Sequence, residues 1–100
     1  MKFVNLTPHV VRSNDGTEYA PSGTVARVAS SYTPFINDVC QVIFGDVYGL
    51  PDASEGVMYV VSGMVSQATK RVDVVSPATG HPAAVRKDGQ IYSVPGFVRS

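Results

Sequence analysis

Five consecutive apolar residues, Val57-Met58-Tyr59-Val60-Val61, decide how this sequence is expected to fold. A strand with one covered face alternates apolar and polar residues, whereas a strand covered on both faces is apolar throughout. The segment shows no alternation, and Gly56 and Ser62 bound it. We therefore expect residues 57–61 to form the central strand of the protein.

Further strands are expected on both sides of this segment, because short runs rich in Val, Tyr, Phe and Thr alternate with turn-forming residues. Two of the separators, Asn14-Asp15-Gly16 and Asp88-Gly89, predict hairpins, since Asp and Gly accept the positive φ angles that fit strand twist. The longest β-like run is Val39 to Tyr48, in which Gly45 indicates a bulge or a close backbone approach.

One short helix is expected after the central segment, over about Gly63 to Lys70, because Ser62 can cap its free N–H groups. Parallel strands each need a crossover connection, and the sequence predicts only one helix. The pattern therefore favours a mainly β fold, a compact antiparallel barrel or sandwich of about seven strands with one short helix. Residues 1–100 are expected to form a single domain.

Charge and composition argue against several classes of partner. Eight Lys and Arg balance eight Asp and Glu, so no positive field favours nucleic acid. No apolar run approaches the roughly 18 residues of a membrane span, and the N-terminal residues turn polar too early for a signal peptide. The single cysteine, Cys40, favours a reducing compartment and is expected to be buried. These features predict a cytoplasmic protein without nucleic-acid or membrane partners; the oligomeric state stays open.

Polar residues gather at two breaks between strands and form the candidate ligand site. If the first and last hairpins close a barrel, both breaks line one mouth, where they suit a small polar or phosphorylated ligand. We expect Arg86 to anchor that ligand, because its planar guanidinium can bind a phosphate or carboxylate through two hydrogen bonds. Ser62 is added because a helix start can hold an anion. The remaining candidates are Asn5, Thr7, His9 and Thr79, with Gly80 and His81 in the second break.

Catalytic and metal sites receive little support from the sequence. His9, Cys40 and His81 lack the close spacing of zinc ligands, and no phosphate-binding loop precedes the expected helix. We predict no catalytic residue, no metal and no cofactor. The alternative of two unrelated surface turns in place of a ligand site stays open.

Four stretches of the chain together resemble a family of small proteins found in tailed phages, prophages and bacterial genomes. The first opens with an Asn-Leu-Thr-Pro-His motif, and His81-Pro82 departs from the family pattern. The resemblance implies a bacterial cytoplasm and a small accessory protein, and it carries no established activity. The stretches are residues 3–9, 44–51, 59–62 and 77–80 followed by Ala84-Val85-Arg86.

The sequence therefore predicts a non-catalytic binding module, a phage or prophage accessory protein that engages a host protein or a small polar ligand. The alternatives are a small hydrolase-type enzyme and a minor virion or assembly component. A ligand-binding form is expected to have a concave pocket, and a protein-binding form is expected to expose an apolar patch. The candidates for that patch are Tyr32, Phe35, Tyr48 and Phe97.

Overall fold

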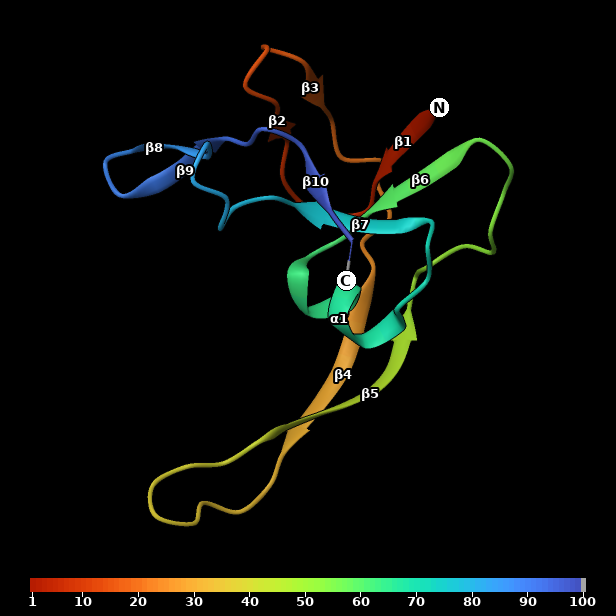
Figure 1. Cartoon of the computed structure of the whole chain (residues 1–100). Coiled ribbons are helices and arrows are strands. Elements are labelled where there is room, and N and C mark those ends of the chain that lie inside the picture. Colours follow the sequence, from red (N-terminus) through yellow and green to blue (C-terminus); the bar gives the residue numbers. More distant parts are fainter. Residues whose placement is uncertain (100) are drawn as a thin grey trace.

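The structure is a computed structural model that describes residues 1–99. Most of its regular structure is β-strand, and its centre is a four-stranded sheet in the order β1-β6-β7-β10 (Figure 1). These strands are Lys2–Asn5, Val57–Val60, Val74–Pro77 and Phe97–Val98.

The prediction of a central strand at residues 57–61 is confirmed, because β6 lies between β1 and β7. Tyr59 and Val61 pack in one buried cluster with Leu6 and with Val65 of the helix. Val60 points to the opposite face and packs in a second cluster with Val75. Both faces of the strand are covered, which explains why it is apolar throughout.

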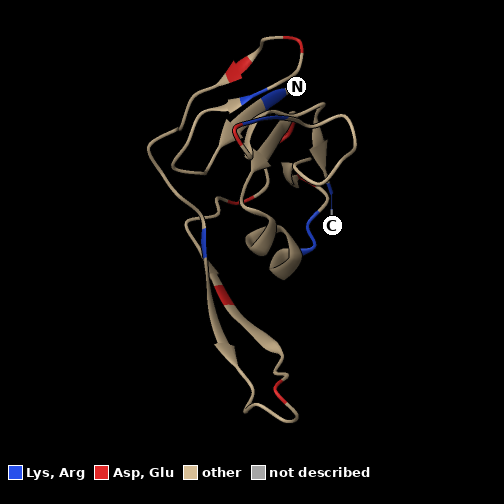
Figure 2. Ribbon diagram, turned by 90° about the vertical axis from the view of Figure 1, so that its left-hand side faces the viewer, with Lys and Arg blue, Asp and Glu red and all other residues tan. Residues whose placement is uncertain are grey.

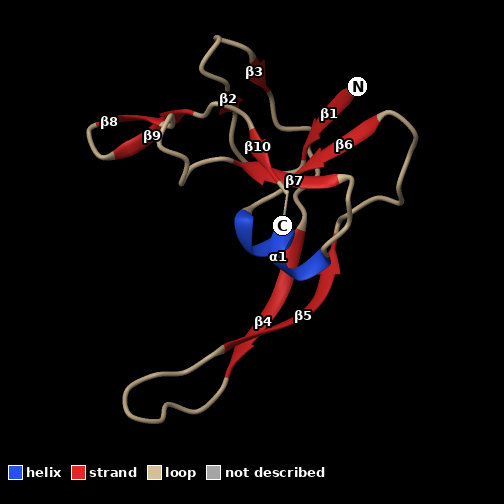
Figure 3. Cartoon of the chain, viewed as in Figure 1, coloured by secondary structure: helices blue, strands red, loops and turns tan. Residues whose placement is uncertain are grey.

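The single helix is also confirmed, as α1 at Gly63–Thr69 (Figure 3). The Ser62 side chain caps it by accepting a hydrogen bond from the Val65 N–H at 3.4 Å. The helix connects β6 to β7, which run parallel, and β1 also runs parallel to β6.

The expected antiparallel barrel or sandwich is therefore wrong in its detail, although the mainly β class holds. Two of the three strand pairs in the central sheet are parallel, and no sheet in residues 1–99 closes into a barrel. Each of the two parallel pairs needs a crossover connection. The helix α1 makes the one from β6 to β7, and strands β2 to β5 make the one from β1 to β6, so one helix serves both pairs.

Three antiparallel ribbons surround this sheet. Asn14-Asp15-Gly16 connects β2 to β3, and Asp88-Gly89 connects β8 to β9, so both hairpin predictions are confirmed. Asp88 and Gly89 have φ angles of 53° and 78°, as the tight turn requires. The third ribbon pairs β4 with β5. The six strands are Val11–Arg12, Glu18–Tyr19, Arg27–Tyr32, Val42–Tyr48, Val85–Lys87 and Gln90–Ser93.

The β4–β5 ribbon, with its connecting turn, projects from the body as an arm (residues 27–48; Figures 1 and 3). The radius of gyration is 14.8 Å, against about 13 Å for a compact chain of this length. The expected bulge is present as a register shift near Ala29, opposite Gly45. A Cβ on Gly45 would lie 3.4 Å from the Ala29 Cβ, so the backbones also approach closely there.

Two expectations about burial are wrong. Cys40 is only half-buried, because it lies on the arm between the Ile36-to-Val39 turn and β5, outside both core clusters. Phe97, expected on an exposed patch, is half-buried and stacks on Phe3 with ring centroids 5.0 Å apart. Tyr32, Phe35 and Tyr48 are exposed, as expected, and all three belong to the arm.

No helix within residues 1–99 is long and apolar enough to cross a membrane; α1 has only seven residues.

Candidate binding cleft

The direction of the strands creates the candidate site. Because β1, β6 and β7 run parallel, their carboxyl ends lie at one edge of the sheet. The register pairs Asn5 with Val60 and Val60 with Val75, so the three following segments leave the sheet side by side. Open sheets commonly bind ligands in the crevice beyond such ends.

A cleft of about 1190 Å³ lies at this edge. The three segments that follow the parallel strands form part of its wall, and β2, β9 and the chain end close the remainder. Apolar and hydroxyl side chains predominate, with two histidines and one arginine among them. The lining residues used below are Thr7, His9, Arg12, Ser62, Thr79, His81, Ile91, Tyr92 and Val98.

Asn5 lies beneath the cleft and holds one of its loops in place. Its side chain is 2 % exposed, and its Nδ2 donates to the carbonyl oxygens of His9 and Tyr19, both at 2.8 Å. Its Oδ1 accepts from the Thr7 N–H at 2.9 Å. A buried amide with these partners positions the Thr7-Pro8-His9 turn, and it does not line the cleft itself.

Thr7 and His9 reach the cleft from this turn. The Thr7 Oγ1 lies 2.7 Å from the Asn5 Oδ1 and 3.1 Å from the His9 carbonyl oxygen, so its single proton serves one of two acceptors at a time. His9 is exposed. The sequence-predicted grouping of Thr7 and His9 is therefore present at the wall of the cleft.

The loop after β7 supplies the opposite wall and carries Thr79 and His81. The His81 Nδ1 accepts a hydrogen bond from the Ala83 N–H at 3.0 Å. The His81 carbonyl oxygen accepts a second one from the Ala84 N–H, also at 3.0 Å. With Nδ1 acting as an acceptor, the neutral imidazole carries its proton on Nε2, which can then donate to a ligand.

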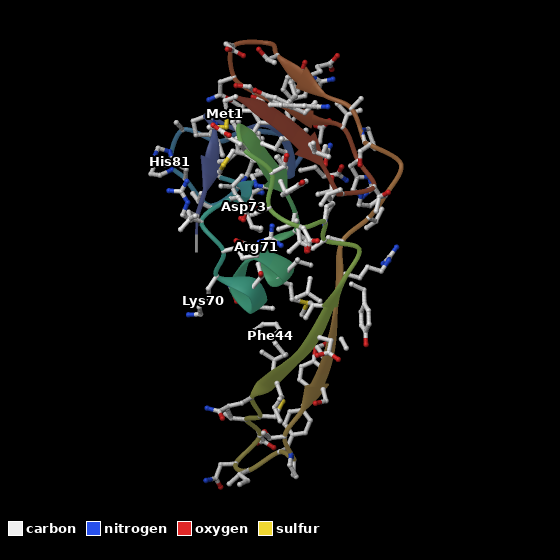
Figure 4. All side chains as sticks on the ribbon, turned by 90° about the vertical axis from the view of Figure 1, so that its right-hand side faces the viewer. Met1, Phe44, Lys70, Arg71, Asp73 and His81 are labelled. Atoms are coloured by element: carbon white, nitrogen blue, oxygen red, sulfur yellow. The ribbon has the colours of Figure 1, made fainter. Side chains whose placement is uncertain are left out.

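Arg86 lies at the rim of the cleft, not in its wall. Its Nη2 donates to the Thr79 carbonyl oxygen at 3.4 Å, so it contacts a lining residue. An ion pair of Arg86 with Asp73 or Asp88 would explain this arginine without a ligand. Asp73 instead binds Arg71 through hydrogen bonds of 2.9 and 2.6 Å, and the ion pairs found among residues 1–99 do not include Arg86. Figure 4 shows these two side chains next to one another above α1. That pair lowers the pKa of Asp73.

Two further cations flank an aromatic ring of the cleft. The Lys87 Nζ lies 3.7 Å from the centroid of the Tyr92 ring, and the Arg12 guanidinium lies 4.6 Å from it. Arg12 also donates from Nε to Glu18 at 3.0 Å, which raises the pKa of Arg12. No Asp or Glu lines the cleft in the part of the chain that the structure describes. The cleft is therefore apolar, with Arg86 and Lys87 as cations at its rim and with the charge of Arg12 balanced by Glu18.

Ser62 lines the cleft, but its Oγ already caps the helix. Cys40 lies on the arm, between the Ile36-to-Val39 turn and β5, and does not line the cleft. Residues 1–99 contain no group of three or more His, Cys, Asp or Glu that could hold a metal ion.

The sequence did not indicate Ile91, Tyr92 and Val98 as lining residues. Ile91 and Tyr92 are consecutive apolar residues of β9 that stay exposed, and β9 shows no alternation that would have marked one of them. The direction of the strands would have located the cleft, but an antiparallel sheet was expected and the strand ends were therefore not expected at one edge. Parallel β1, β6 and β7 would have predicted a cleft at Thr7, Ser62 and Thr79 directly.

The chain matches no family model, no curated protein and no solved structure in the comparisons made with them.

Proposed function

We propose that the protein is a non-catalytic binding module whose cleft takes a ligand with an apolar body and an anionic group. The observation that carries this proposal is the combination of an apolar cleft with two cations at its rim, Arg86 and Lys87. Arg12 lines the wall, where it is ion-paired with Glu18. Apolar walls give affinity by burial, and a few convergent polar groups fix the orientation of the ligand.

The two histidines and the hydroxyl of Thr79 add hydrogen-bond donors to this cationic rim. An anionic group finds charge-assisted partners there, and these are stronger than neutral hydrogen bonds. A catalytic role has less support, because Ser62 caps α1 and Cys40 lies on the arm.

Phenyl phosphate is a suitable probe, since it joins an aromatic ring to a dianion, and benzyl alcohol is its uncharged counterpart. In an amide NMR titration, phenyl phosphate is expected to shift the signals of Thr79, His81 and Ile91 first. Benzyl alcohol should bind at least about tenfold more weakly, because one well-placed charged hydrogen bond contributes roughly 1.5–3 kcal/mol.

Two variants make the titration specific to the cleft. Ile91→Asp adds a carboxylate to the wall and should weaken phenyl phosphate binding by at least about tenfold. Val72→Ser is the matched control, because Val72 is 77 % exposed and lies outside the cleft. Shifts scattered over the whole surface, or equal binding by both variants, would refute the proposed site.

Arg86→Lys tests the anchoring role expected of Arg86. The substitution keeps the positive charge but removes the planar pair of donors. If Arg86 binds the phosphate through two hydrogen bonds, phenyl phosphate affinity should fall roughly five- to tenfold. Unchanged affinity would show that Arg86 contributes only its positive charge and does not bind the phosphate through two hydrogen bonds.

A protein partner is the second candidate, and the exposed arm favours it. Tyr32, Phe35 and Tyr48 are 63 %, 73 % and 59 % exposed, and they are spread along one projecting ribbon, with Tyr48 at its base and the other two farther out. Aromatic side chains of this kind are enriched in protein interfaces. That the chain is a phage or prophage accessory protein in a bacterial cytoplasm stays a prediction, supported by the sequence resemblance.

A further inference from the structure

The arm ends in an apolar tip that is built around a tight turn. Asn37 and Asp38 have φ angles of 51° and 65°, which is the pattern of a two-residue hairpin turn. Ile36 and Val39 close this turn with backbone hydrogen bonds of 2.9 and 3.1 Å. Phe35, Ile36 and Val39 are 73 %, 72 % and 67 % exposed around it. The tip is therefore preorganised, and its side chains lose little backbone freedom when they are covered.

Only the base of the arm is supported by the body. Val28 and Val47 pack against the cluster that contains Val65 of α1. Farther out the ribbon has only two strands, with an open edge on each side (Figure 1). An isolated two-stranded ribbon is marginally stable in water, and exposed strand edges favour association. The outer arm has the properties of a surface that becomes covered.

Charge is divided unevenly between the arm and the opposite end of the chain. The arm contains one cation, Arg27 at its base, and two acidic residues, Asp38 and Asp46, and residues 28–69 contain no Lys or Arg (Figure 2). Residues 70–99 contain five Lys and Arg against two Asp. Two of those cations, Arg86 and Lys87, lie at the rim of the cleft. The acidic, apolar tip therefore complements the cationic, apolar cleft.

The dimensions agree with this complementarity. A cleft of about 1190 Å³ exceeds the roughly 300–1,000 Å³ of a typical small-ligand pocket, so it has room for several side chains. The arm extends away from the central sheet in all views (Figures 1, 2 and 4), whereas the cleft lies at the carboxyl edge of that sheet. The tip and the cleft of one chain are therefore separate surfaces.

We propose that the arm tip of one copy docks in the cleft of a second copy of this chain. Phe35 and Ile36 would enter the apolar cleft, and Asp38 would face the rim cations. Two copies related by a two-fold axis can exchange arms and make both contacts, which closes the assembly. This inference rests on the proposed function, because it names a partner for the same cleft.

Sedimentation equilibrium tests the association directly. The wild-type chain is expected to form a species of twice 10.6 kDa, and it should not remain a monomer up to about 1 mM. An arm variant, Phe35→Ser with Ile36→Ser, should weaken association at least about tenfold, and Ile91→Asp in the cleft should do the same. Val72→Ser, an exposed apolar position outside both surfaces, should associate as the wild type does.

Mixing the two variants gives the sharpest readout. Each homodimer lacks both contacts, whereas the mixture keeps one intact pair, the tip of the cleft variant and the cleft of the arm variant. A mixed dimer should therefore form where neither variant associates alone. A mixture that stays monomeric, or variants that associate as well as the wild type, would overturn the inference.

Crosslinking keeps the inference testable if a variant does not fold. Under mild oxidation, Thr79→Cys should form an intermolecular disulfide with the native Cys40, because Cys40 lies near the docked tip. Val72→Cys is the matched control and should not form this disulfide. Absence of the Thr79→Cys crosslink would overturn the inference.

Failure of this inference can be distinguished from failure of the proposed function. If the wild type stays monomeric while phenyl phosphate still shifts the cleft signals, the cleft binds a ligand but not the arm. If the arm docks, the arm variant should bind phenyl phosphate more tightly than the wild type, because its cleft is open.

Discussion

The central sheet and the arm are similar in amino-acid composition but differ in how far their side chains are buried. Val60 and Val61 of the sheet are fully buried, whereas Val39 and Ile43 of the arm are 67 % and 51 % exposed. Both regions are rich in Val and aromatic residues, which favour strands, and both regions form strands. The difference lies in what covers them: α1 and neighbouring strands cover the sheet, and residues 1–99 provide no cover for the outer arm. Apolar content therefore predicts a strand but not its burial.

The largest expected difference between the two regions is in core stability. Val60→Ala should lower the free energy of unfolding by about 2–3 kcal/mol, because it removes fully buried methyl groups and leaves a cavity. The matched change Val39→Ala in the arm should change it by less than about 0.5 kcal/mol in the monomer. Urea denaturation of both variants checks this contrast, and equal losses would show that the arm is part of the core.

A second substitution tests whether the sheet holds the cleft in place. Asn5→Ala should cost about 2 kcal/mol, because it leaves buried partners of the amide without hydrogen bonds. It should also weaken phenyl phosphate binding, since the Thr7-to-His9 turn loses its support. Denaturation and the NMR titration measure the two effects, and a loss of stability with unchanged affinity would separate Asn5 from the cleft.

The base of the arm can be tested at Gly49, where φ is 78° and an added Cβ would lie 2.7 Å from the Val25 carbonyl oxygen. Gly49→Ala should cost about 2 kcal/mol, from the left-handed conformation and the clash together. Gly16→Ala has a similar φ of 92° but open space, so it should cost only about 1 kcal/mol. Thermal unfolding compares the pair, and equal costs would show that the arm base relaxes freely.

The smallest expected effect is the pH-dependent contribution of the Arg71–Asp73 ion pair to the free energy of unfolding. This pair lies in the body and has no counterpart on the arm. The hydrogen bonds from Arg71 hold the pKa of Asp73 below its ordinary value of about 3.9. The Asp73 carboxylate therefore binds a proton more readily in the unfolded chain than in the folded one. The stabilisation by the ion pair is complete above the unfolded pKa of Asp73 and is lost as pH falls through its folded pKa.

Asp73→Asn should accordingly lower the stability by at most about 1 kcal/mol at pH 7, because the two side chains remain 30 % and 15 % exposed. The difference from the wild type should disappear toward pH 2. Urea denaturation at both pH values measures it, and a difference that grows in acid would contradict the assigned cause.

The local features of this fold were predictable from the sequence, and the long-range ones were not. Three local features could be predicted because they depend on neighbouring residues alone. They are the helix cap at Ser62, the turn at Asp88-Gly89 and the burial of the apolar run from Val57 to Val61. Strand direction depends on pairing between residues more than fifty positions apart, such as Asn5 with Val60. Nothing local distinguishes the parallel from the antiparallel pairing of those segments.

The candidate site was predictable for the same local reason. Turns that carry Thr7, His9 and Thr79 were visible as polar breaks, and the structure brings them to one cleft. The roles of Asn5 and Arg86 depend on which side chains lie behind or beside the cleft, and residue type alone does not indicate that. Cys40 was misplaced because an apolar neighbourhood in sequence was read as a core.

The absence of Lys and Arg between Val28 and Thr69 has a practical consequence for digestion experiments. Trypsin has no cleavage site there, so the whole arm leaves a digest as part of one long peptide, from Val28 to Lys70. Chymotrypsin, which cleaves after aromatic residues, has exposed sites at Tyr32 and Phe35. Parallel digests with the two proteases therefore report whether the arm is covered, with tryptic cutting as the internal reference for the body.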